Sequence, residues 1–258
     1  MIEIDRALAL IAIWAFLSAG TIIAAQTESR AGRVAWIAVG IGIVAARAGF
    51  IFQNMGAFLV EPWTIIALWQ GGFMPWLGIA ATAATVIVTL GRQPATAYLI
   101  GALIALSLTH VAVGAATATK PKPLPSTIVL RSMAGAEVAL DTMRGQPFVL
   151  NLWATWCPPC RRELPMLMDV AGNTDVPVLL VNQGEPAGRV RAFLSINDLP
   201  GGSVILDTEQ RVAAATGARA FPTTLFVNAD GEIARVHTGE ISRAALTAAI
   251  RDLERATL

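Results

Sequence analysis

The only two cysteines of this chain are Cys157 and Cys160, and Pro158 and Pro159 stand between them. A cysteine pair at this spacing can close a small disulfide ring or open to a dithiol. The thiolate form of a cysteine is the one that attacks a disulfide sulfur. The spacing therefore favours thiol–disulfide exchange, in which Cys157 attacks and Cys160 resolves the mixed disulfide.

The flanking sequence predicts where this pair lies. The strongly apolar run 148–153 is typical of a buried strand, and a helical pattern begins just after Cys160. Cys157 is thus expected at a strand-to-helix turn, at the amino end of the helix. Unpaired N–H groups and the helix dipole stabilise a thiolate there. Cys160 is expected one turn further in, where it is better shielded.

Two other uses of the cysteine pair are weaker interpretations. A zinc site needs two more ligands, and the two histidines, His110 and His237, fall in distant predicted elements and are given no role. A purely structural disulfide would close too short a loop to constrain much of the unfolded chain. We therefore expect no metal and no cofactor apart from the redox-active disulfide Cys157–Cys160.

Composition divides the chain into two halves. Of its 258 residues 55% are hydrophobic and 14% are charged, which is too apolar for one ordinary soluble domain. Four acidic residues and five arginines precede Lys120, whereas 14 basic and 14 acidic residues follow from there. This distribution predicts a membrane half and then a soluble half. The net charge of +1 gives no indication of nucleic-acid binding.

Four apolar segments in the first half approach the roughly 20 residues that a membrane-spanning helix needs. They are Ala7–Ala25, Val34–Phe52, Met74–Leu90 and Thr96–Ala116. The connection Gln53–Gly72 is longer than the others, and Glu61-Pro62 within it is a plausible helix start. Its apolar residues and tryptophans favour a helix that lies in the membrane interface and contacts lipid.

The expected topology places both chain ends on one side of the membrane. Arg30 and Arg33 in the first short connection slightly favour a cytoplasmic position for that connection. The cysteine half is then extracytoplasmic, where disulfides form and persist. We expect a multi-pass protein of the cytoplasmic (inner) membrane with its soluble domain in the periplasm.

The predicted organisation is a transmembrane domain of about four helices over 1–116, a proline-rich linker over 117–127 and an α/β domain over 128–258. Strands are expected at 128–131, 147–153, 177–182, 203–206, 223–227 and 233–237. Helices are expected at 158–170 with an interruption at Pro165, and at 187–197, 208–216 and 242–253. This order predicts a mixed sheet flanked by helices on both faces.

Five separated motifs in the soluble half resemble the TlpA/ResA branch of extracytoplasmic thiol–disulfide oxidoreductases, in the thioredoxin superfamily. They are Asn151-Leu-Trp-Ala-Thr-Trp-Cys157, Arg161-Arg-Glu-Leu-Pro165, Val181-Asn-Gln-Gly-Glu185, Leu206-Asp-Thr208 and Phe221-Pro-Thr-Thr-Leu225. The resemblance covers about 126–258. It implies a thioredoxin fold in which Pro222 is cis and lies opposite the cysteine pair; an ordinary trans proline in a turn is the alternative.

The resemblance also implies roles for individual residues. The catalytic set would be Cys157, Cys160, Glu163 and Pro222, and substrate would bind at Trp156, Pro158, Phe221 and Thr223. Glu163 would accept the proton of the buried cysteine, because Asn151 stands where many thioredoxins have an aspartate; Glu185 is a possible second group. The alternatives are that Glu163 only complements the helix amino end and that Glu185 is a solvated loop residue.

The membrane half resembles the early part of prolipoprotein diacylglyceryl transferase at three places: Arg47-Ala-Gly-Phe50, Glu61-Pro-Trp63 and Leu68-Trp-Gln-Gly-Gly-Phe73. It departs from that family at Met74–Gly78, where the family has a His-Gly-Gly run. Arg47 is notable because a charge inside a span is costly and is usually paired or functional. The alternative is an arginine that snorkels near a helix end.

These observations predict a membrane-anchored disulfide reductase that acts on partner proteins through a mixed disulfide at Cys157. Residues 1–119 contain no cysteine, so a separate membrane thiol reductant should keep the pair reduced. The resemblance suggests cytochrome c maturation as the process. The alternatives are an oxidase that donates its disulfide and a lipid-processing transferase with an accessory thioredoxin domain.

The direction of electron flow is predicted from the groups around Cys157. Pro158 and Pro159 offer no N–H donor to its sulfur, and Arg161 and Arg162 are expected to point to solvent. A nearby acid, Glu163, opposes a second negative charge. The thiolate is then only moderately stabilised, which predicts a reduction potential nearer about −270 mV than about −120 mV.

Overall fold

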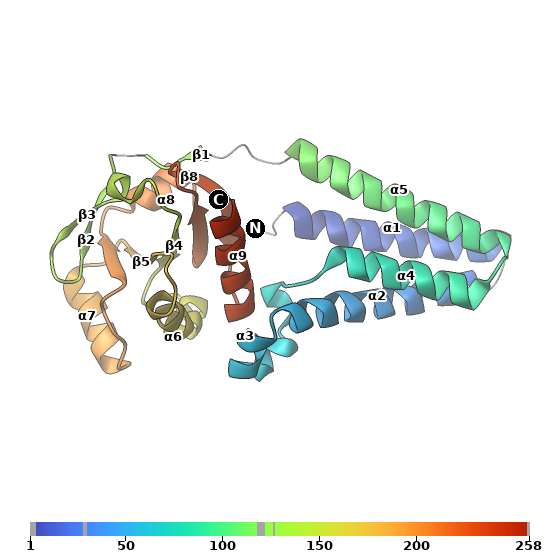
Figure 1. The fold of residues 1–258 in the computed structure, drawn as a ribbon, viewed down its shortest axis with the longest axis horizontal. Helices are drawn as coiled ribbons and strands as arrows, with labels where there is room; N and C mark the ends of the chain where they lie inside the picture. Colours follow the sequence, from blue (N-terminus) through green and yellow to red (C-terminus); the bar gives the residue numbers. More distant parts are fainter. Residues whose placement is uncertain (1–3, 28–29, 118–121, 126, 257–258) are drawn as a thin grey trace. The chain divides into compact units, whose positions relative to one another are not determined.

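The structure is a computed structural model that describes residues 4–27, 30–117, 122–125 and 127–256. Within these, the chain forms two compact units. One holds residues 4–56 and 72–117 and is helical. The other holds residues 57–71 and 122–256 and contains the cysteine pair. Figure 1 shows the order of their helices and strands.

The helical unit contains four apolar helices, one for each segment expected to span the membrane. They are α1 (Ile4–Gln26), α2 (Ala31–Gln53), α4 (Pro75–Leu90) and α5 (Pro94–Thr117). By length and composition α1, α2 and α5 can cross a membrane. The helix α4 has 16 residues, about 24 Å, which falls short of a hydrocarbon core of about 30 Å. Three of the four expected spans therefore reach the required length.

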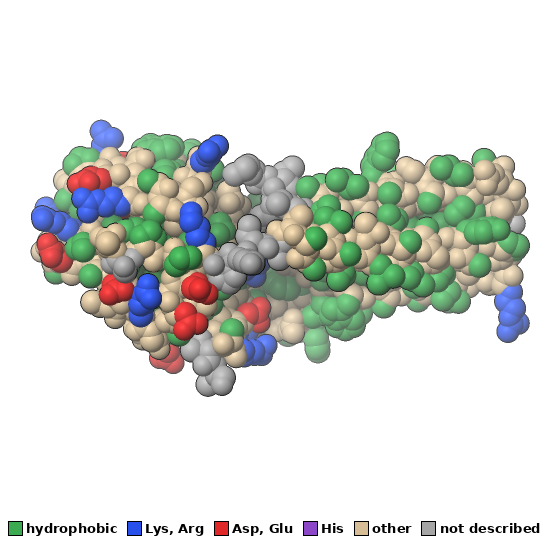
Figure 2. All heavy atoms as spheres, turned by 90° about the horizontal axis from the view of Figure 1, so that it is seen from above, with side chains coloured by type: hydrophobic (Ala, Val, Ile, Leu, Met, Phe, Trp, Pro, Cys, Tyr) green, Lys and Arg blue, Asp and Glu red, His purple; other side chains and the backbone are tan. Residues whose placement is uncertain are grey.

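Small residues let helices α2 and α4 approach closely. A Cβ atom placed on Gly42 of α2 would lie 2.9 Å from the carbonyl oxygen of Gly78 on α4. The Thr82 hydroxyl of α4 donates to the carbonyl of Ala38 at 3.3 Å. Such contacts associate helices where lipid supplies no hydrophobic drive. Figure 2 shows hydrophobic side chains spread over the helical unit, and acidic and basic ones gathered over the unit that carries the cysteines.

The connection that follows α2 is broken into short pieces instead of forming one interfacial helix. These are α3 (Met55–Val60), η1 (Pro62–Ile65) and η2 (Leu68–Gln70), and Pro62 occupies the first position of η1 as expected. The backbone leaves the helical region at Glu61 and at Ala67, and Gly71 has a positive φ of 78°. Trp63 and Trp69 are exposed, while Thr64 and Gln70 are buried.

The second unit is built on a mixed sheet of eight strands among the described residues, in the order β1-β8-β7-β4-β5-β6-β2-β3. The strands are β1 (Lys122–Pro123), β2 (Val129–Ser132), β3 (Glu137–Ala139), β4 (Phe148–Trp153), β5 (Val178–Gln183), β6 (Val204–Asp207), β7 (Thr223–Val227) and β8 (Glu232–Thr238). β4, β5 and β6 are mutually parallel, and the other pairings are antiparallel.

Helices cover both faces of this sheet, as the alternation of strands and helices predicts. They are η3 (Leu140–Met143), α6 (Pro158–Gly172), α7 (Ala187–Ile196), α8 (Arg211–Thr216) and α9 (Arg243–Arg255). Val149 and Trp153 of β4 pack on the face covered by α6, α7 and α9. Leu150 and Leu152 pack on the opposite face with α8. Every residue of β4 is buried, because this central strand has a helical layer on each side.

Three expected boundaries are wrong. The helix α6 runs through Pro165 without interruption to Gly172; the proline costs about 3 kcal/mol, and the buried Leu164 and Leu167 each offset roughly 1.5–3 kcal/mol. Part of the expected linker, Lys122–Pro123, is strand β1 and pairs with β8. Residues 118–121 and 126 of that linker lie outside the described residues.

The third wrong boundary is the start of α8, which begins at Arg211 instead of Thr208. The Asp207 carboxylate accepts hydrogen bonds from the backbone N–H groups of Arg211 and Val212, each at 2.9 Å. This carboxylate satisfies two N–H groups that have no partner within the helix. The chain therefore turns at 208–210 before the helix starts.

Candidate active site

The cysteine pair lies at the turn that joins β4 to α6, as predicted. Cys157 caps the amino end of α6, with Pro158 as the first helical residue. The two cysteines form a disulfide with their Cα atoms 5.3 Å apart. Cys160 is fully buried and Cys157 is 3% exposed, whereas the preceding Trp156 is 64% exposed. The expected difference in shielding between the two cysteines is small in this disulfide form.

One backbone donor serves the sulfur of Cys157. The N–H of Cys160 lies 3.3 Å from the Cys157 Sγ atom, and Pro158 and Pro159 have no N–H to add. The N–H of Arg161 is used by the Cys157 carbonyl, at 3.1 Å. A thiolate at Cys157 would thus be stabilised by one N–H and by the helix dipole.

The loop before β7 that contains Phe221 and Pro222, which we call the proline loop, borders the turn that carries the cysteine pair. The Phe221–Pro222 peptide bond is cis, as the resemblance implied. The Phe221 ring lies 6.0 Å from the Trp156 ring, centroid to centroid. The Thr223 side chain is buried, and its hydroxyl donates to the carbonyl of Ala220 at 2.7 Å. Trp156 and Phe221 therefore form an apolar surface beside the disulfide, while the Thr223 hydroxyl is used inside the loop.

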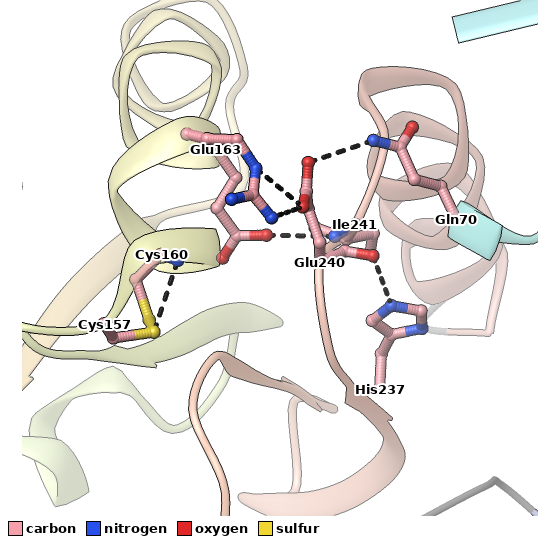
Figure 3. A network of polar contacts seen from close by, with 8 residues as sticks. Gln70, Cys157, Cys160, Glu163, His237, Glu240 and Ile241 are labelled. Atoms are coloured by element: carbon pink, nitrogen blue, oxygen red, sulfur yellow. Dashed lines mark hydrogen bonds and ion pairs between the residues drawn. A yellow bond between two sulfur atoms is a disulfide. The ribbon is translucent and has the colours of Figure 1, made fainter. Parts of the chain in front are cut away.

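Glu163 is buried on α6, one turn after Cys160. Its Oε1 accepts the Asn151 side-chain N–H at 3.0 Å, and its Oε2 accepts the backbone N–H of Ile241 at 2.9 Å. Figure 3 shows the carboxylate between the cysteine pair and Ile241. These contacts fix the carboxylate inside the unit, so Glu163 does more than complement the helix end from the surface.

The environment of Glu163 adjusts its pKa. Burial raises the pKa of this carboxyl to about 8, because the charged form loses hydration; the hydrogen bonds from Ile241 and Asn151 oppose this, and the nearby Glu240 charge adds to it. A carboxyl group with a pKa near neutral can both take up and release a proton at physiological pH. This geometry is suited to a group that exchanges a proton with the buried cysteine.

Glu185 is buried, so the alternative of a solvated loop residue is wrong. Its carboxylate accepts the backbone N–H of Thr155 at 2.7 Å, the Thr155 hydroxyl at 2.6 Å and the Asn182 side-chain N–H at 2.8 Å. Thr155 lies two residues before Cys157. The contacts of Glu185 therefore hold the turn that carries the cysteine pair.

Sequence reasoning missed the loop between β8 and α9. Glu240 there pairs with Arg162, whose Nη2 atom lies 2.8 Å from the Glu240 Oε2. Arg162 is 62% exposed, as expected for a side chain that points to solvent, and it forms this ion pair in addition. The guanidinium of Arg161 lies 5.7 Å from the centroid of the Phe193 ring. No local pattern marked Glu240, because its partners are distant in sequence.

Arg47 belongs to the helical unit and not to the unit that holds the cysteine pair. It is buried, its Nη1 donates to the carbonyl of Gly72 at 2.8 Å, and its guanidinium lies 5.6 Å from the centroid of the Phe73 ring. Arg47 is thus held inside its unit by these contacts. This contact fits the expectation that a charge within a span is paired.

Comparison with known proteins gives a family match that includes the cysteine pair. The family described as "AhpC/TSA family" matches residues 122–236. A protein named thiol-disulfide oxidoreductase ResA from Halalkalibacterium halodurans is 36% identical over 114 residues, which cover 43% of this chain and 64% of the relative. A protein of the same name from Geobacillus thermodenitrificans is 32% identical over 160 residues, which cover 61% of this chain and 87% of the relative.

A third relative, a thiol:disulfide interchange protein DsbE homolog from Paracoccus denitrificans, is 34% identical over 133 residues, which cover 48% of this chain and 73% of the relative. The chain spans slightly less than two thirds of the Halalkalibacterium protein and more of the other two. These comparisons give no support to the resemblance of the membrane half to prolipoprotein diacylglyceryl transferase.

Proposed function

The chain belongs to the ResA/DsbE/TlpA-type thiol–disulfide oxidoreductases, and on this premise we propose that it reduces disulfide bonds in partner proteins outside the cytoplasm. The observation that carries the proposal is the buried Glu163, held one turn from Cys160 by Asn151 and Ile241. A proton acceptor at this place serves the cysteine that must be deprotonated inside the protein.

The reaction runs in two exchange steps. The Cys157 thiolate attacks one sulfur of the partner's disulfide, which forms a mixed disulfide and releases the other partner sulfur as a thiolate. Glu163 then takes the proton of the Cys160 thiol. The resulting thiolate attacks the Cys157 sulfur, the disulfide Cys157–Cys160 forms, and the second partner sulfur leaves. Two electrons pass from the dithiol to the partner, which ends as a dithiol.

Substrate is proposed to bind at the surface formed by Trp156 and Phe221. Trp156 is exposed beside the disulfide, which suits an apolar contact with a partner segment. In our proposal the backbone at Phe221 pairs with an extended substrate strand, with Pro158 and Thr223 at the edges of this site. The process suggested by the family resemblance is cytochrome c maturation.

The groups around Cys157 support the reductase direction. Only the Cys160 N–H serves its sulfur among residues 158–161. Arg162 is engaged by Glu240 and so adds no contact to the thiolate. A moderately stabilised thiolate corresponds to a reduction potential nearer about −270 mV than about −120 mV.

The helical part is proposed to anchor the oxidoreductase domain in the cytoplasmic membrane. Helices α1, α2 and α5 are long and apolar enough to cross it, and the exposed Trp63 and Trp69 suit the lipid interface. In this division a membrane part over 1–116 precedes the oxidoreductase domain, whose first strand is β1. Because residues 1–119 contain no cysteine, a separate membrane thiol reductant would resupply electrons.

The test is the reduction potential of the full-length protein in detergent micelles. The protein is equilibrated with mixtures of reduced and oxidised glutathione, free thiols are alkylated, and the fraction with both Cys157 and Cys160 labelled is measured by mass spectrometry. We expect a midpoint nearer about −270 mV. A midpoint near about −120 mV would overturn the reductase direction and favour a disulfide-donating oxidase.

A further inference from the structure

The loop between β8 and α9 contacts two functional groups at once. The N–H of Gly239 donates to the carbonyl of Pro222 at 2.9 Å. Two residues later, the N–H of Ile241 donates to the Glu163 carboxylate at 2.9 Å. The intervening Glu240 carbonyl lies 3.3 Å from the Nε2 atom of His237. A displacement of Glu240 would therefore change both the proline loop and the hydrogen bond to Glu163.

The side chain of Glu240 is fixed from two directions. Its Oε1 accepts an N–H from the Gln70 side chain at 3.2 Å, and its Oε2 accepts from Arg162 Nη2 at 2.8 Å. Gln70 is 3% exposed and the Glu240 side chain is 12% exposed. Because a carboxylate oxygen only accepts hydrogen bonds, the side-chain amide NH₂ group of Gln70 must face it. Figure 3 shows this chain of contacts from Gln70 through Glu240 and Ile241 to Glu163.

A second contact joins residues 57–71 to the start of α9. Arg243, two residues after Ile241, donates to the Glu61 carboxylate at 3.0 Å and to the Asp169 carboxylate of α6. The Arg243 and Glu61 side chains are 15% and 20% exposed. Residues 57–71 belong to the same compact unit as the cysteine pair. Residues 57–71 are thus attached on both sides of Ile241. Gln70 contacts Glu240, and Glu61 contacts Arg243.

We propose that Glu240 and Gln70 are positioning residues of the dithiol reaction: Gln70 holds Glu240, and Glu240 fixes the Ile241 N–H on the proton acceptor Glu163. The inference rests on the proposed role of Glu163. It gives the segment that follows α2 a function beyond membrane contact, since this segment helps to set how readily Glu163 takes the Cys160 proton.

The charges near Glu163 determine whether its pKa rises or falls when Glu240 is replaced. Glu240 is negative and raises the pKa of Glu163, while Arg162 is positive and lowers it. His237 of β8 borders the Glu240 carbonyl, and Asn151 of β4, which donates to Glu163, is neutral. Replacing Glu240 by glutamine removes the negative charge that raises the pKa of Glu163, and this favours the ionised form of Glu163.

The experiment measures the resolving step against pH in the full-length protein in detergent micelles. The reduced protein reacts with oxidised glutathione, and release of the second glutathione from the mixed disulfide is followed after rapid quenching. We expect Glu240→Gln to lower the pH midpoint of this step by roughly half a pH unit. We expect Gln70→Ala to shift the wild-type midpoint but to add no shift in a Glu240→Ala background, because alanine removes the acceptor that Gln70 contacts.

Matched control variants separate a specific shift of the pH midpoint from general effects of substitution. Glu209→Gln removes another carboxylate paired with an arginine, at 2.7 Å from Arg211, and Gln93→Ala removes an exposed glutamine; neither should move the midpoint. If Glu240→Gln does not fold, the comparison of Gln70→Ala with Gln93→Ala carries the test.

The outcomes distinguish this inference from the proposed function. In one outcome, Glu163→Gln abolishes the pH dependence of the resolving step while Glu240→Gln and Gln70→Ala leave its pH midpoint at the wild-type value. That result refutes the positioning role, and the role of Glu163 stands. If Glu163→Gln also leaves the midpoint unchanged, the assignment of Glu163 as proton acceptor fails, and the positioning role fails with it.

Discussion

Replacing Glu163 by glutamine should abolish a pH dependence of stability in the oxidised protein. Burial raises the pKa of this carboxyl from 4.5 to about 8. Between these two values the folded protein holds a proton on Glu163 that the unfolded chain has released. Stability from this group is therefore fully present below pH 4.5 and is lost as the pH rises towards 8.

The magnitude follows from the width of this window. One pH unit corresponds to about 1.4 kcal/mol when the two states differ by one bound proton. The wild-type free energy of unfolding should thus fall by about 1.4 kcal/mol per pH unit relative to Glu163→Gln in the middle of the window. A glutamine also has one side-chain N–H₂ group where Glu163 accepts from Asn151 or Ile241, and this mismatch adds an offset that does not depend on pH.

Hydrogen exchange of the β4 amides, 148–153, measures this difference in the full-length oxidised protein. The strand is central and buried, so its slowest amides report unfolding of the unit. The ratio of exchange rates between wild type and Glu163→Gln cancels the intrinsic effect of pH on exchange. We expect this ratio to change about tenfold per pH unit between pH 5.5 and 7.5.

Parallel pH profiles for wild type and Glu163→Gln would refute the reasoning, since they would mean that this carboxyl has the same pKa in both states. The control is Glu209→Gln. Its carboxylate is exposed on the surface, and it should leave the slope unchanged.

Three further predictions concern other parts of the chain. Glu185→Ala leaves the Thr155 N–H without its acceptor and should destabilise the unit by about 1–3 kcal/mol, measured by the same exchange assay. A tag after Leu258 should be cleaved by protease outside spheroplasts while a thiol probe at Arg92 is protected; the reverse pattern would place the domain in the cytoplasm. Reconstituted alone in vesicles, the protein should pass no electrons from an internal reductant to an external disulfide, and measurable transfer would contradict an anchoring role.

The sequence predicted those parts of the fold that depend on local patterns. The apolar run 148–153 and the helical pattern after Cys160 placed the cysteines on β4 and α6, because burial and helix periodicity are visible in a short window. The apolar segments of the first half likewise marked helices α1, α2, α4 and α5. A single proline misled the prediction at Pro165, because the packing that tolerates it comes from other elements.

The contacts of the candidate site were less predictable. Gln70 and Glu240 are 170 residues apart, and no periodicity links a segment between apolar helices to a loop after β8. The burial of Glu185 depends on Thr155 and Asn182, which meet only when β4 and β5 are paired. The resemblance indicated Glu163 and Pro222, but the residues that hold them in place were found only from the folded chain.

The most direct test of the central claim is to trap the mixed disulfide at Cys157. The full-length Cys160→Ser variant is reduced and then exposed to a disulfide-bonded protein such as insulin, and Cys157→Ser is treated in parallel. We predict a covalent adduct that survives denaturation in Cys160→Ser, maps to Cys157 by peptide mass spectrometry and is released by reductant. Equal adduct formation in Cys157→Ser, or none in Cys160→Ser, would contradict an exchange reaction that begins at Cys157.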